Sequence, residues 1–270
     1  MDNGEVIAAA PREPVEPPRI VDEIAGGSPV RAVWENELGG LTFRIDAEPE
    51  VWFVKWSPPG FSLSPEVERL RWAVTYAAVP RVLDHGADST GEWMVTAGLP
   101  GCSAVDDRWI AEPGTAVRAI GSGLRELHEA VPVADCPFDW SAEVRTTVAR
   151  RRAAAGELDQ AGWPPELPRV DGIAEALDVL ADVPPVDRAV VCHGDACAPN
   201  TLIGEDGRFA GHVDLGGLGV ADRWADLAIA TMATRWNYGP GWEEPLLDAY
   251  GISPDPDRTA YYRLLWYLAD

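Results

Sequence analysis

Hydrophobic and polar positions follow a two-residue period in the first third of the chain and a helical period in most of the rest. Short apolar segments bounded by turn residues predict β-strands at residues 30–34, 41–45, 51–56, 79–83 and 93–96. Ser64-Pro65 is typical of a helix start, and a helix is expected from there to about residue 78. A small β-rich region with one main helix is therefore predicted to come first.

From residue 113 onward the apolar positions indicate helices. Val117, Ile120, Leu124 and Leu127 lie on one helical face, and Ser141 can cap a following helix with Arg145 on its exposed side. Later helices are expected at residues 171–180, from about 222 onward and at 257–270. The pattern predicts an α+β chain with a flexible Pro-rich tail (1–18), a β-rich N-terminal lobe (19–97) and a larger, mainly helical C-terminal lobe (98–270).

One segment of the helical part is β-rich and carries polar side chains at its strand ends. A strand at 189–192 leads into His193-Gly194-Asp195, and Pro199 then excludes a helix. Asn200 precedes a second strand, and a turn at 205–207 returns the chain to Asp214. Asp195, Asn200 and Asp214 should therefore face one site, where their oxygens suit Mg²⁺ and bound phosphates. The alternative is a loop aspartate that caps backbone groups beside an ordinary hairpin.

The residues HGDACAPN, followed by VDLGGLGVADRWADLA, resemble the aminoglycoside O-phosphotransferase family. Weaker similarities extend from about Val30 over most of the chain. The resemblance implies a two-lobe, protein-kinase-like fold with a nucleotide between the lobes. It also implies that Asp195 is the catalytic residue and that Asn200 and Asp214 bind the metal, Mg²⁺.

Candidate nucleotide-binding residues lie in the predicted N-terminal lobe. Gly39 and Gly40 in a hairpin can place backbone N–H groups over phosphates, although a plain β-turn explains them equally well. Lys55 lies within an apolar strand and needs a partner for its charge. Phe53 falls on the same strand face as Lys55 and either contacts adenine or packs in the core.

The partner of Lys55 is expected in the helix after Ser64. Glu66 and Glu68 both compete for it, and the family pattern Glu-x-x-Arg-Leu selects Glu66. Either glutamate could also be a solvated helix residue. Thr96 and Ala97 form the expected hinge, where backbone groups could pair with the adenine edge.

Composition narrows the classes of partner. The net charge of −22 argues against nucleic-acid binding and favours cationic ligands, although acidic proteomes give the same balance. The sequence contains no apolar stretch of about 20 residues and no signal segment, so a cytoplasmic protein that binds no membrane is expected. The four cysteines form no CxxC pair, and buried free thiols are predicted.

These observations predict an enzyme that transfers the γ-phosphoryl group of ATP or GTP to a hydroxyl of a small, cationic acceptor. The family resemblance implies an aminoglycoside acceptor and hence antibiotic resistance. A kinase of the same fold with another alcohol as acceptor is one alternative. A nucleotide-binding regulator without transfer activity is another, but the intact Asp195, Asn200 and Asp214 speak against it.

The acceptor side departs from the family pattern. Gly217 stands where some 3′-acting relatives have arginine, and Trp236, Asn237 and Leu265-Trp266-Tyr267 stand where they have acidic contacts. Candidate acids for a cationic acceptor remain at Glu157, Asp159, Asp222, Glu243, Glu244 and Asp270. A shifted acceptor range is therefore expected, and the acceptor and the oligomeric state stay open at this point.

Overall fold

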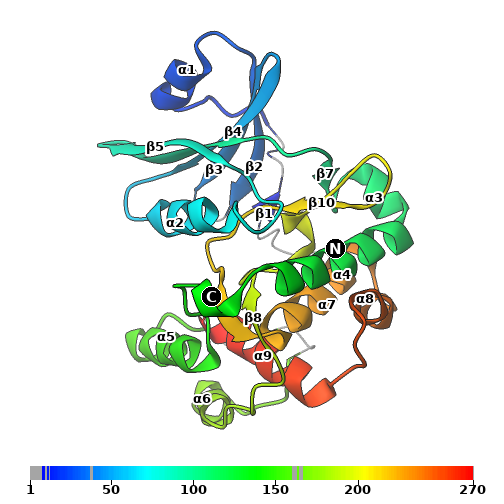
Figure 1. The fold of residues 1–270 in the computed structure, drawn as a ribbon. Helices are drawn as coiled ribbons and strands as arrows, with labels where there is room; N and C mark the ends of the chain where they lie inside the picture. The colour runs from blue at the N-terminus through cyan, green and yellow to red at the C-terminus, as the bar shows by residue number, and fades with distance from the viewer. Residues whose placement is uncertain are drawn as a thin grey trace. The chain divides into compact units, whose positions relative to one another are not determined.

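A computed structural model describes residues 8–9, 11, 13–36, 39–159, 163 and 167–269. Much of the predicted flexible tail lies outside these residues, as do Glu37 and Leu38 of the first hairpin and the candidate acid Asp270. The chain forms two compact units (Figure 1). The first comprises Met1–Thr75 and Val79–Leu99, and the second comprises Tyr76–Ala78 and Pro100–Asp270.

The first unit is an antiparallel sheet with two helices. Its strands lie in the order β1-β2-β3-β4-β6-β5. Their bounds are β1 Ala8–Ala9, β2 Val30–Asn36, β3 Leu41–Ala47, β4 Glu50–Ser57, β5 Val82–Asp88 and β6 Gly91–Ala97. The helices are α1 Arg19–Ala25 and α2 Ser64–Ala73, and α2 packs beside β5 (Figure 1). Within the predicted tail, Ala8 and Ala9 pair with Asn36 and Glu35.

Alternation in the strands explains the core of this unit. Phe43 and Ile45 of β3 are fully buried, whereas Arg44 between them is partly exposed. Val54 of β4 is the register partner of Phe43, and Val21 of α1 packs into the same cluster. The hydrophobic face of β3 and β4 therefore fixes the register of the strands next to Lys55.

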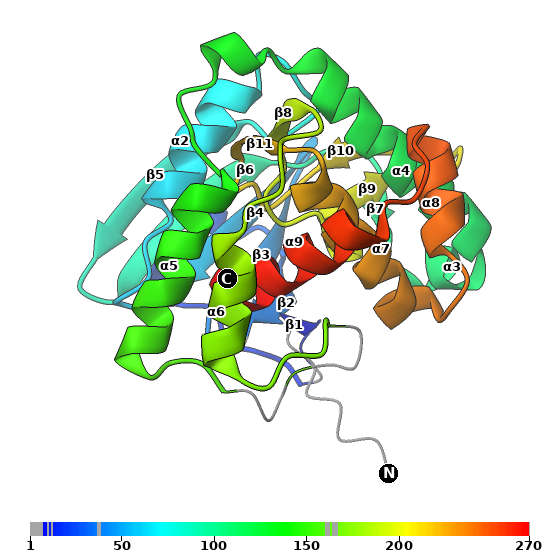
Figure 2. The ribbon, with the colours of Figure 1, turned by 90° about the horizontal axis from the view of Figure 1, so that it is seen from below.

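The second unit is mainly helical and holds two small sheets, ordered β10-β9-β7 and β11-β8. Its strands are β7 Cys102–Ser103, β8 Ala189–Cys192, β9 Thr201–Ile203, β10 Phe209–His212 and β11 Gly219–Asp222. Its helices are α3 Asp107–Ala111, α4 Pro113–Ala130, η1 Val133–Asp135, α5 Ala142–Ala155, α6 Ile173–Ala181, η3 Ala198–Asn200, α7 Trp224–Tyr238, α8 Glu243–Tyr250 and α9 Pro256–Ala269. Helix α9 packs against both α5 and α7 (Figure 2).

Helix α4 carries the predicted apolar stripe and packs closely against α8. Ile120 and Leu124 of α4 are buried, as is Leu246 of α8. At Gly121 a Cβ atom would come within 2.5 Å of the Leu246 carbonyl oxygen, so only glycine permits this approach. The close packing of the two helices therefore brings Leu127-His128, near the end of α4, close to Tyr250, at the end of α8.

Several expectations for these elements were wrong in detail. Helix α2 ends at Ala73 rather than near 78, Leu63 rather than Ser64 is its N-cap, and β5 begins at Val82. Helix α5 is capped by Ser141 as predicted, but Arg145 is 2% exposed rather than solvated. Its guanidinium lies 4.9 Å from the ring centroid of Trp140, and this packing turns it inward.

Helices α3 and α8 were not predicted, because α3 is short and α8 is interrupted by a proline near its start. The four cysteines are free thiols, and Cys192 is buried, whereas the other three are partly exposed. Among the residues that the structure describes, no helix has the length and apolar character needed to cross a membrane.

Candidate functional site

The loop after β8 carries the predicted catalytic residue and is packed without spare room. Gly194 has φ of 91°, and a Cβ atom there would lie 2.1 Å from the carbonyl oxygen of Gly217. Gly217 is itself enclosed, because its own Cβ would lie 3.0 Å from Cζ2 of Trp140. The two glycines thus let the His193–Asp195 loop and the segment after Asp214 touch through their backbones.

Asp195 lies at the end of this loop, and only one of its two carboxylate oxygens accepts a hydrogen bond from an N–H group. The Asn200 side-chain amide donates to the Asp195 carbonyl oxygen and to Oδ2, each at 3.0 Å. Oδ1 is buried and accepts no N–H or O–H hydrogen bond from any described residue. Burial raises the pKa of Asp195, and the Asp214 carboxylate raises it further, while Cys197, His193 and Asn200 act in the opposite direction.

The His193 side chain ties together the segments that carry the two aspartates. Its Nδ1 accepts the Asp195 backbone N–H at 3.3 Å, and its Nε2 is 3.0 Å from the Val213 carbonyl oxygen. Since Nδ1 accepts, the proton must lie on Nε2, which donates to Val213. The backbone of Asp195 itself and that of Val213, the residue before Asp214, are thereby held by one ring.

Asp214 has φ of 62°, the one described non-glycine residue with a positive φ. A left-handed conformation is costly for most side chains and is tolerated best by Asn and Asp. It occurs directly after β10, where the chain turns toward Gly217. Asp214, Asn200 and Asp195 together present carboxylate and amide oxygens, the donor set that a hard divalent cation prefers.

Asp226 of α7 holds the backbone of the His193–Asp195 loop, which is called the catalytic loop below after the role predicted for Asp195. Its Oδ2 accepts the His193 backbone N–H at 2.6 Å, and its Oδ1 accepts the Gly194 N–H at 3.0 Å. His128 of α4 lies 2.9 Å from Oδ2. Burial alone would raise the pKa of Asp226, but the His128 hydrogen bond, the nearby imidazoles and the Gly194 N–H outweigh burial and lower it.

Sequence reasoning assigned His128 and Asp226 to packing and to a helix start. Both residues lie in motifs that the family resemblance includes, Leu127-His128 and Trp224-Ala225-Asp226, so the signal for a specific role was present. His128, Cys192 and Asp226 also lie close enough together to suggest a metal site. However, His128 and Asp226 are bonded to each other, and burial raises the pKa of the Cys192 thiol, which disfavours the thiolate that binds metals.

In the first unit, Lys55 of β4 is paired with Glu66 of α2. Lys55 Nζ lies 2.7 Å from Glu66 Oε2, and the Glu66 side chain is 8% exposed. Glu68 is exposed, and the structure therefore agrees with the choice of Glu66 as the partner. A buried glutamate that holds a lysine on a strand face is the arrangement that positions an ammonium group for phosphate oxygens.

The glycine hairpin does not present the free backbone donors that were expected of it. The Gly39 N–H donates to the Asn36 carbonyl oxygen at 3.0 Å, and the Gly40 N–H donates to Asn36 Oδ1 at 2.7 Å. Both amides are thus used inside the hairpin, as in the plain β-turn that was the alternative.

At the expected hinge, too, backbone N–H groups are bonded within the protein instead of being free for a ligand. Thr96 is the register partner of Phe53, so the two lie side by side on adjacent strands. The Ala97 N–H donates to the Arg81 carbonyl at 2.9 Å, and the Gly98 N–H donates to the Val51 carbonyl at 2.7 Å. Leu99 is the next residue, and its N–H makes no hydrogen bond to a described residue. An N–H that could meet a ligand therefore occurs at Leu99, two residues after Ala97.

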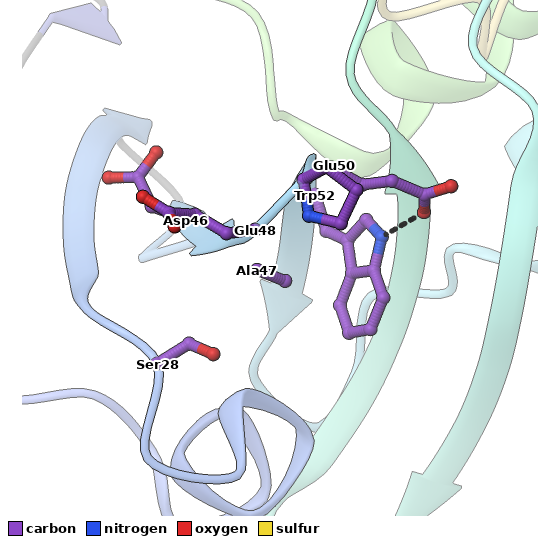
Figure 3. Close-up of a pocket in the computed structure, with 7 residues that line it drawn as sticks. Ser28, Asp46, Ala47, Glu48, Glu50 and Trp52 are labelled. Atoms are coloured by element: carbon purple, nitrogen blue, oxygen red, sulfur yellow. Dashed lines mark hydrogen bonds between the residues drawn. The ribbon is translucent and has the colours of Figure 1, made fainter.

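A hollow at the turn between β3 and β4 is distinct from the predicted nucleotide site. Figure 3 shows Asp46, Glu48 and Glu50 around it, with the Trp52 indole N–H donating to Glu50 at 3.0 Å. None of the predicted nucleotide-binding residues lines it. It is at the opposite end of β3 from Gly40, and its carboxylates would repel phosphates.

Some residues predicted for the acceptor side are exposed to solvent, whereas others are buried in ion pairs within the protein. Trp236 is 41% exposed and lies 5.9 Å from Trp266 between ring centroids, and Trp266 contacts Tyr267 at 5.2 Å. Asp222, in contrast, is buried and bonded to Arg258 at 2.9 Å, so its carboxylate is structural and cannot meet an acceptor.

The remaining acids proposed for the acceptor side differ in their partners. Glu243 is bonded to the buried Arg263 at 2.9 Å, and Glu157 is 3.7 Å from Arg152. Asn237 donates its side-chain amide to the Ala233 carbonyl within α7. Glu244 is exposed and Asp159 lies at the surface near the end of α5.

Comparisons with known proteins show the family of this chain. The model of the phosphotransferase enzyme family matches residues 34–262. An aminoglycoside 3′-phosphotransferase of Streptomyces fradiae is 35% identical over 258 residues, which cover 87% of this chain and 92% of that protein. A streptomycin 3″-kinase of Streptomyces griseus is 35% identical, with 91% of this chain and 94% of that protein covered.

A solved structure adds bound ligands to the comparison. The aminoglycoside phosphotransferase APH(3″)-Id of Streptomyces rimosus, in complex with ADP and streptomycin, superposes with a TM-score of 0.68 at 30% identity. The superposition covers 85% of this chain and 90% of that chain. The N-terminal antiparallel sheet and the helical C-terminal part are those of a kinase-like fold, as the sequence predicted.

Proposed function

Because this chain belongs to the phosphotransferase enzyme family, we propose that it transfers the γ-phosphoryl group of ATP or GTP to a hydroxyl of an aminoglycoside. The similarity to a 3′-phosphotransferase and to a streptomycin 3″-kinase supports this class of acceptor. Phosphorylation of the antibiotic would make the host resistant to it. The net charge of −22 suits an acceptor that carries several ammonium groups.

Asp195 would act on the acceptor hydroxyl. Its Oδ1 accepts the hydroxyl proton while the acceptor oxygen forms a bond to the γ-phosphorus. The bond from that phosphorus to the bridging oxygen then breaks, and the nucleoside diphosphate leaves with the electron pair. Asn200 holds the other carboxylate oxygen, so Oδ1 is presented in one orientation.

Asn200 and Asp214 would hold Mg²⁺, which when bound neutralises phosphate charge. The Asn200 side-chain nitrogen is used on Asp195, and its oxygen is therefore the atom that faces a cation. Lys55, held by Glu66, would bind the α- and β-phosphate oxygens. Phe53 would lie against the adenine, and the Leu99 N–H would bind its edge in place of the Ala97 N–H.

The observation that carries this proposal is the open, buried Oδ1 of Asp195. A buried carboxylate oxygen without a partner is destabilising, and native structures retain such groups chiefly at functional sites. The raised pKa also suits a group that must take up a proton during the reaction. A purely structural aspartate would have both oxygens satisfied, as Asp226 does.

The test is phosphoryl transfer by purified protein to kanamycin-, streptomycin- and hygromycin-type acceptors, with the modified hydroxyl located by phosphorus NMR. Asp195→Asn should lower kcat by roughly 10²–10⁴-fold and leave the melting temperature nearly unchanged. Glu205→Gln, an exposed change in the turn of the same hairpin, is the matched control and should retain full activity.

Two results would contradict the proposal in different ways. Undiminished turnover by well-folded Asp195→Asn would remove the catalytic assignment. Turnover of a neutral alcohol, with none of the three antibiotic types phosphorylated, would leave a phosphotransferase but overturn the aminoglycoside acceptor.

A further inference from the structure

The buried hydrogen bonds of Asp226 continue into α8, beyond the residues that touch the catalytic loop. His128 Nδ1 lies 2.9 Å from the Tyr250 hydroxyl, and His128 Nε2 lies 2.9 Å from Asp226 Oδ2. Tyr250 is 4% exposed, and both side chains of the His128–Asp226 pair are fully buried. A continuous buried chain therefore runs from the end of α8, through α4 and α7, to the backbone of His193 and Gly194.

The direction of every hydrogen bond in this chain is fixed. Asp226 is ionised and can only accept, because its pKa is lowered and its other partners are backbone N–H groups. A neutral His128 ring must then carry its proton on Nε2 and accept at Nδ1. The Tyr250 hydroxyl is the donor to Nδ1, and it holds the ring in the tautomer that Asp226 requires.

The Tyr250 hydroxyl oxygen has a second partner besides His128. The Arg223 guanidinium interacts with Tyr250, and Arg223 is bonded to Asp187 at 2.6 Å. Burial raises the pKa of Tyr250, so the hydroxyl keeps its proton and remains a donor. The Asp187–Arg223 pair is partly exposed, and the chain thus extends from the surface to the catalytic loop.

We propose that Tyr250 is a positioning residue for Asp195, acting through His128 and Asp226 on the backbone of the catalytic loop. This inference rests on the proposed function, because it gives Asp195 the role described above. Tyr250 is buried, and its hydroxyl contacts His128 and Arg223. Its hydroxyl fixes the imidazole, the imidazole fixes the Asp226 carboxylate, and the carboxylate fixes the two N–H groups that immediately precede Asp195.

The chain offers a closely matched control. Tyr261 of α9 is also buried, and its hydroxyl donates one hydrogen bond, to the Leu180 carbonyl at 3.1 Å. Tyr250→Phe and Tyr261→Phe therefore each remove one buried tyrosine hydroxyl, together with the hydrogen bond that it donates, from the same unit. Both should lower the melting temperature by similar amounts, whereas only Tyr250 leads to the loop.

Amide hydrogen exchange, measured by NMR, tests the coupling without relying on any acceptor. Tyr250→Phe should speed the exchange of the His193 and Gly194 amides at least several-fold, and Tyr261→Phe should leave them unchanged. The ring ¹⁵N signals of His128, identified by their loss in His128→Gln, should show the Nε2–H tautomer in the wild type and a mixture in Tyr250→Phe. Equal exchange at both amides in the two tyrosine variants would overturn the proposal.

Kinetics with the acceptor then tests the positioning itself. Tyr250→Phe should lower kcat by roughly 3- to 10-fold, with KM for nucleotide and acceptor unchanged, whereas Tyr261→Phe should match the wild type. In a His128→Gln background, Tyr250→Phe should have no additional effect on kcat. Additive losses, or equal kcat for the two tyrosine variants, would overturn the inference. A wild type that phosphorylates no acceptor would instead refute the proposed function and leave the exchange result standing.

Discussion

Two regions differ in the groups that accept their backbone N–H hydrogen bonds. One is the His193–Asp195 loop of the second unit, and the other comprises the segments of the first unit predicted to bind the nucleotide. Around Asp195, buried side chains hold the backbone: Asp226 accepts two loop N–H groups, and His193 accepts a third. The N–H groups of Gly39 and Ala97 donate instead to backbone carbonyls, and the Gly40 N–H donates to the side chain of Asn36 in the same hairpin.

This difference indicates which groups of each unit remain available to a ligand. At the His193–Asp195 loop three backbone N–H groups are bonded to side chains, and Asp195 Oδ1 accepts no N–H or O–H bond from a described residue. In the first unit the corresponding charge is that of Lys55, paired with Glu66. Under the proposed function, the second unit would be pre-organised for transfer, and the first would bind the nucleotide through this side-chain pair and the Leu99 N–H.

The largest effect is expected at the metal side of the second unit. Asp214→Asn should lower kcat by at least roughly 100-fold, because a neutral amide holds Mg²⁺ poorly. Nucleotide affinity in excess EDTA should be equal in the variant and the wild type, and should differ when Mg²⁺ is present. Asp206→Asn, in the turn of the same hairpin, serves as the control. Equal losses of affinity with and without Mg²⁺ would show that Asp214 does not bind the metal.

The two glycine sites should differ in stability rather than activity. Gly194→Ala should lower the free energy of unfolding by roughly 3 kcal/mol, because strain at positive φ adds to a collision with Gly217. Gly39→Ala has a similar φ of 78°, but its nearest neighbour would be a Pro58 carbon at 3.8 Å. It should cost about 1 kcal/mol. Urea unfolding measures both, and equal costs would mean that the second unit is no more tightly packed there.

Loss of the ion pair should affect nucleotide use by roughly 10-fold or more. Lys55→Met removes the charge that faces phosphate and leaves Glu66 buried without its ammonium partner. Glu66→Gln keeps a hydrogen-bonding group, and it should have a smaller effect. Steady-state kcat/KM for ATP compares the two variants, and Glu68→Gln is the exposed control. An unchanged kcat/KM for ATP in Lys55→Met would exclude a phosphate-binding role.

The smallest effect is a pH dependence of stability at Asp226. Its folded pKa is below the ordinary value of 3.8, so the ionised carboxylate stabilises the protein above pH 3.8. That contribution is lost as the pH falls from 3.8 through the folded pKa. The difference in unfolding free energy between the wild type and Asp226→Asn should be constant near pH 6 and should shrink below 3.8. A difference that stays constant in acid would show that Asp226 is not ionised in the folded protein.

The sequence was most informative where local rules and long-range contacts agree. Strand β8 has the predicted bounds, Ala189–Cys192, and the hairpin after it places Asn200 and Asp214 at its ends. Glu66 was selected over Glu68 from one family pattern. These features depend on short stretches whose periodicity, turn residues and charges all indicate the same structure.

Features that depend on distant packing were not visible in the sequence. Acids at a helix start are common, so only the family motif set Asp226 apart, and that motif did not indicate its hydrogen-bond partners more than 30 positions away. Arg145 looked solvated because helical periodicity does not show that Trp140 covers it. Among the described residues, the unbonded N–H of Leu99 could be identified only once the bonds of Ala97 and Gly98 were known.

The contact between Gly217 and Trp140 constrains how this protein can evolve. A Cβ atom at position 217 would lie 3.0 Å from Cζ2 of Trp140 and 3.1 Å from the Gly194 Cα, so both neighbours would have to shift by a few tenths of an ångström. A smaller residue at position 140 would relieve the first of these contacts and leave the second. The effects on stability of substitutions at positions 140 and 217 are therefore expected to depend on each other.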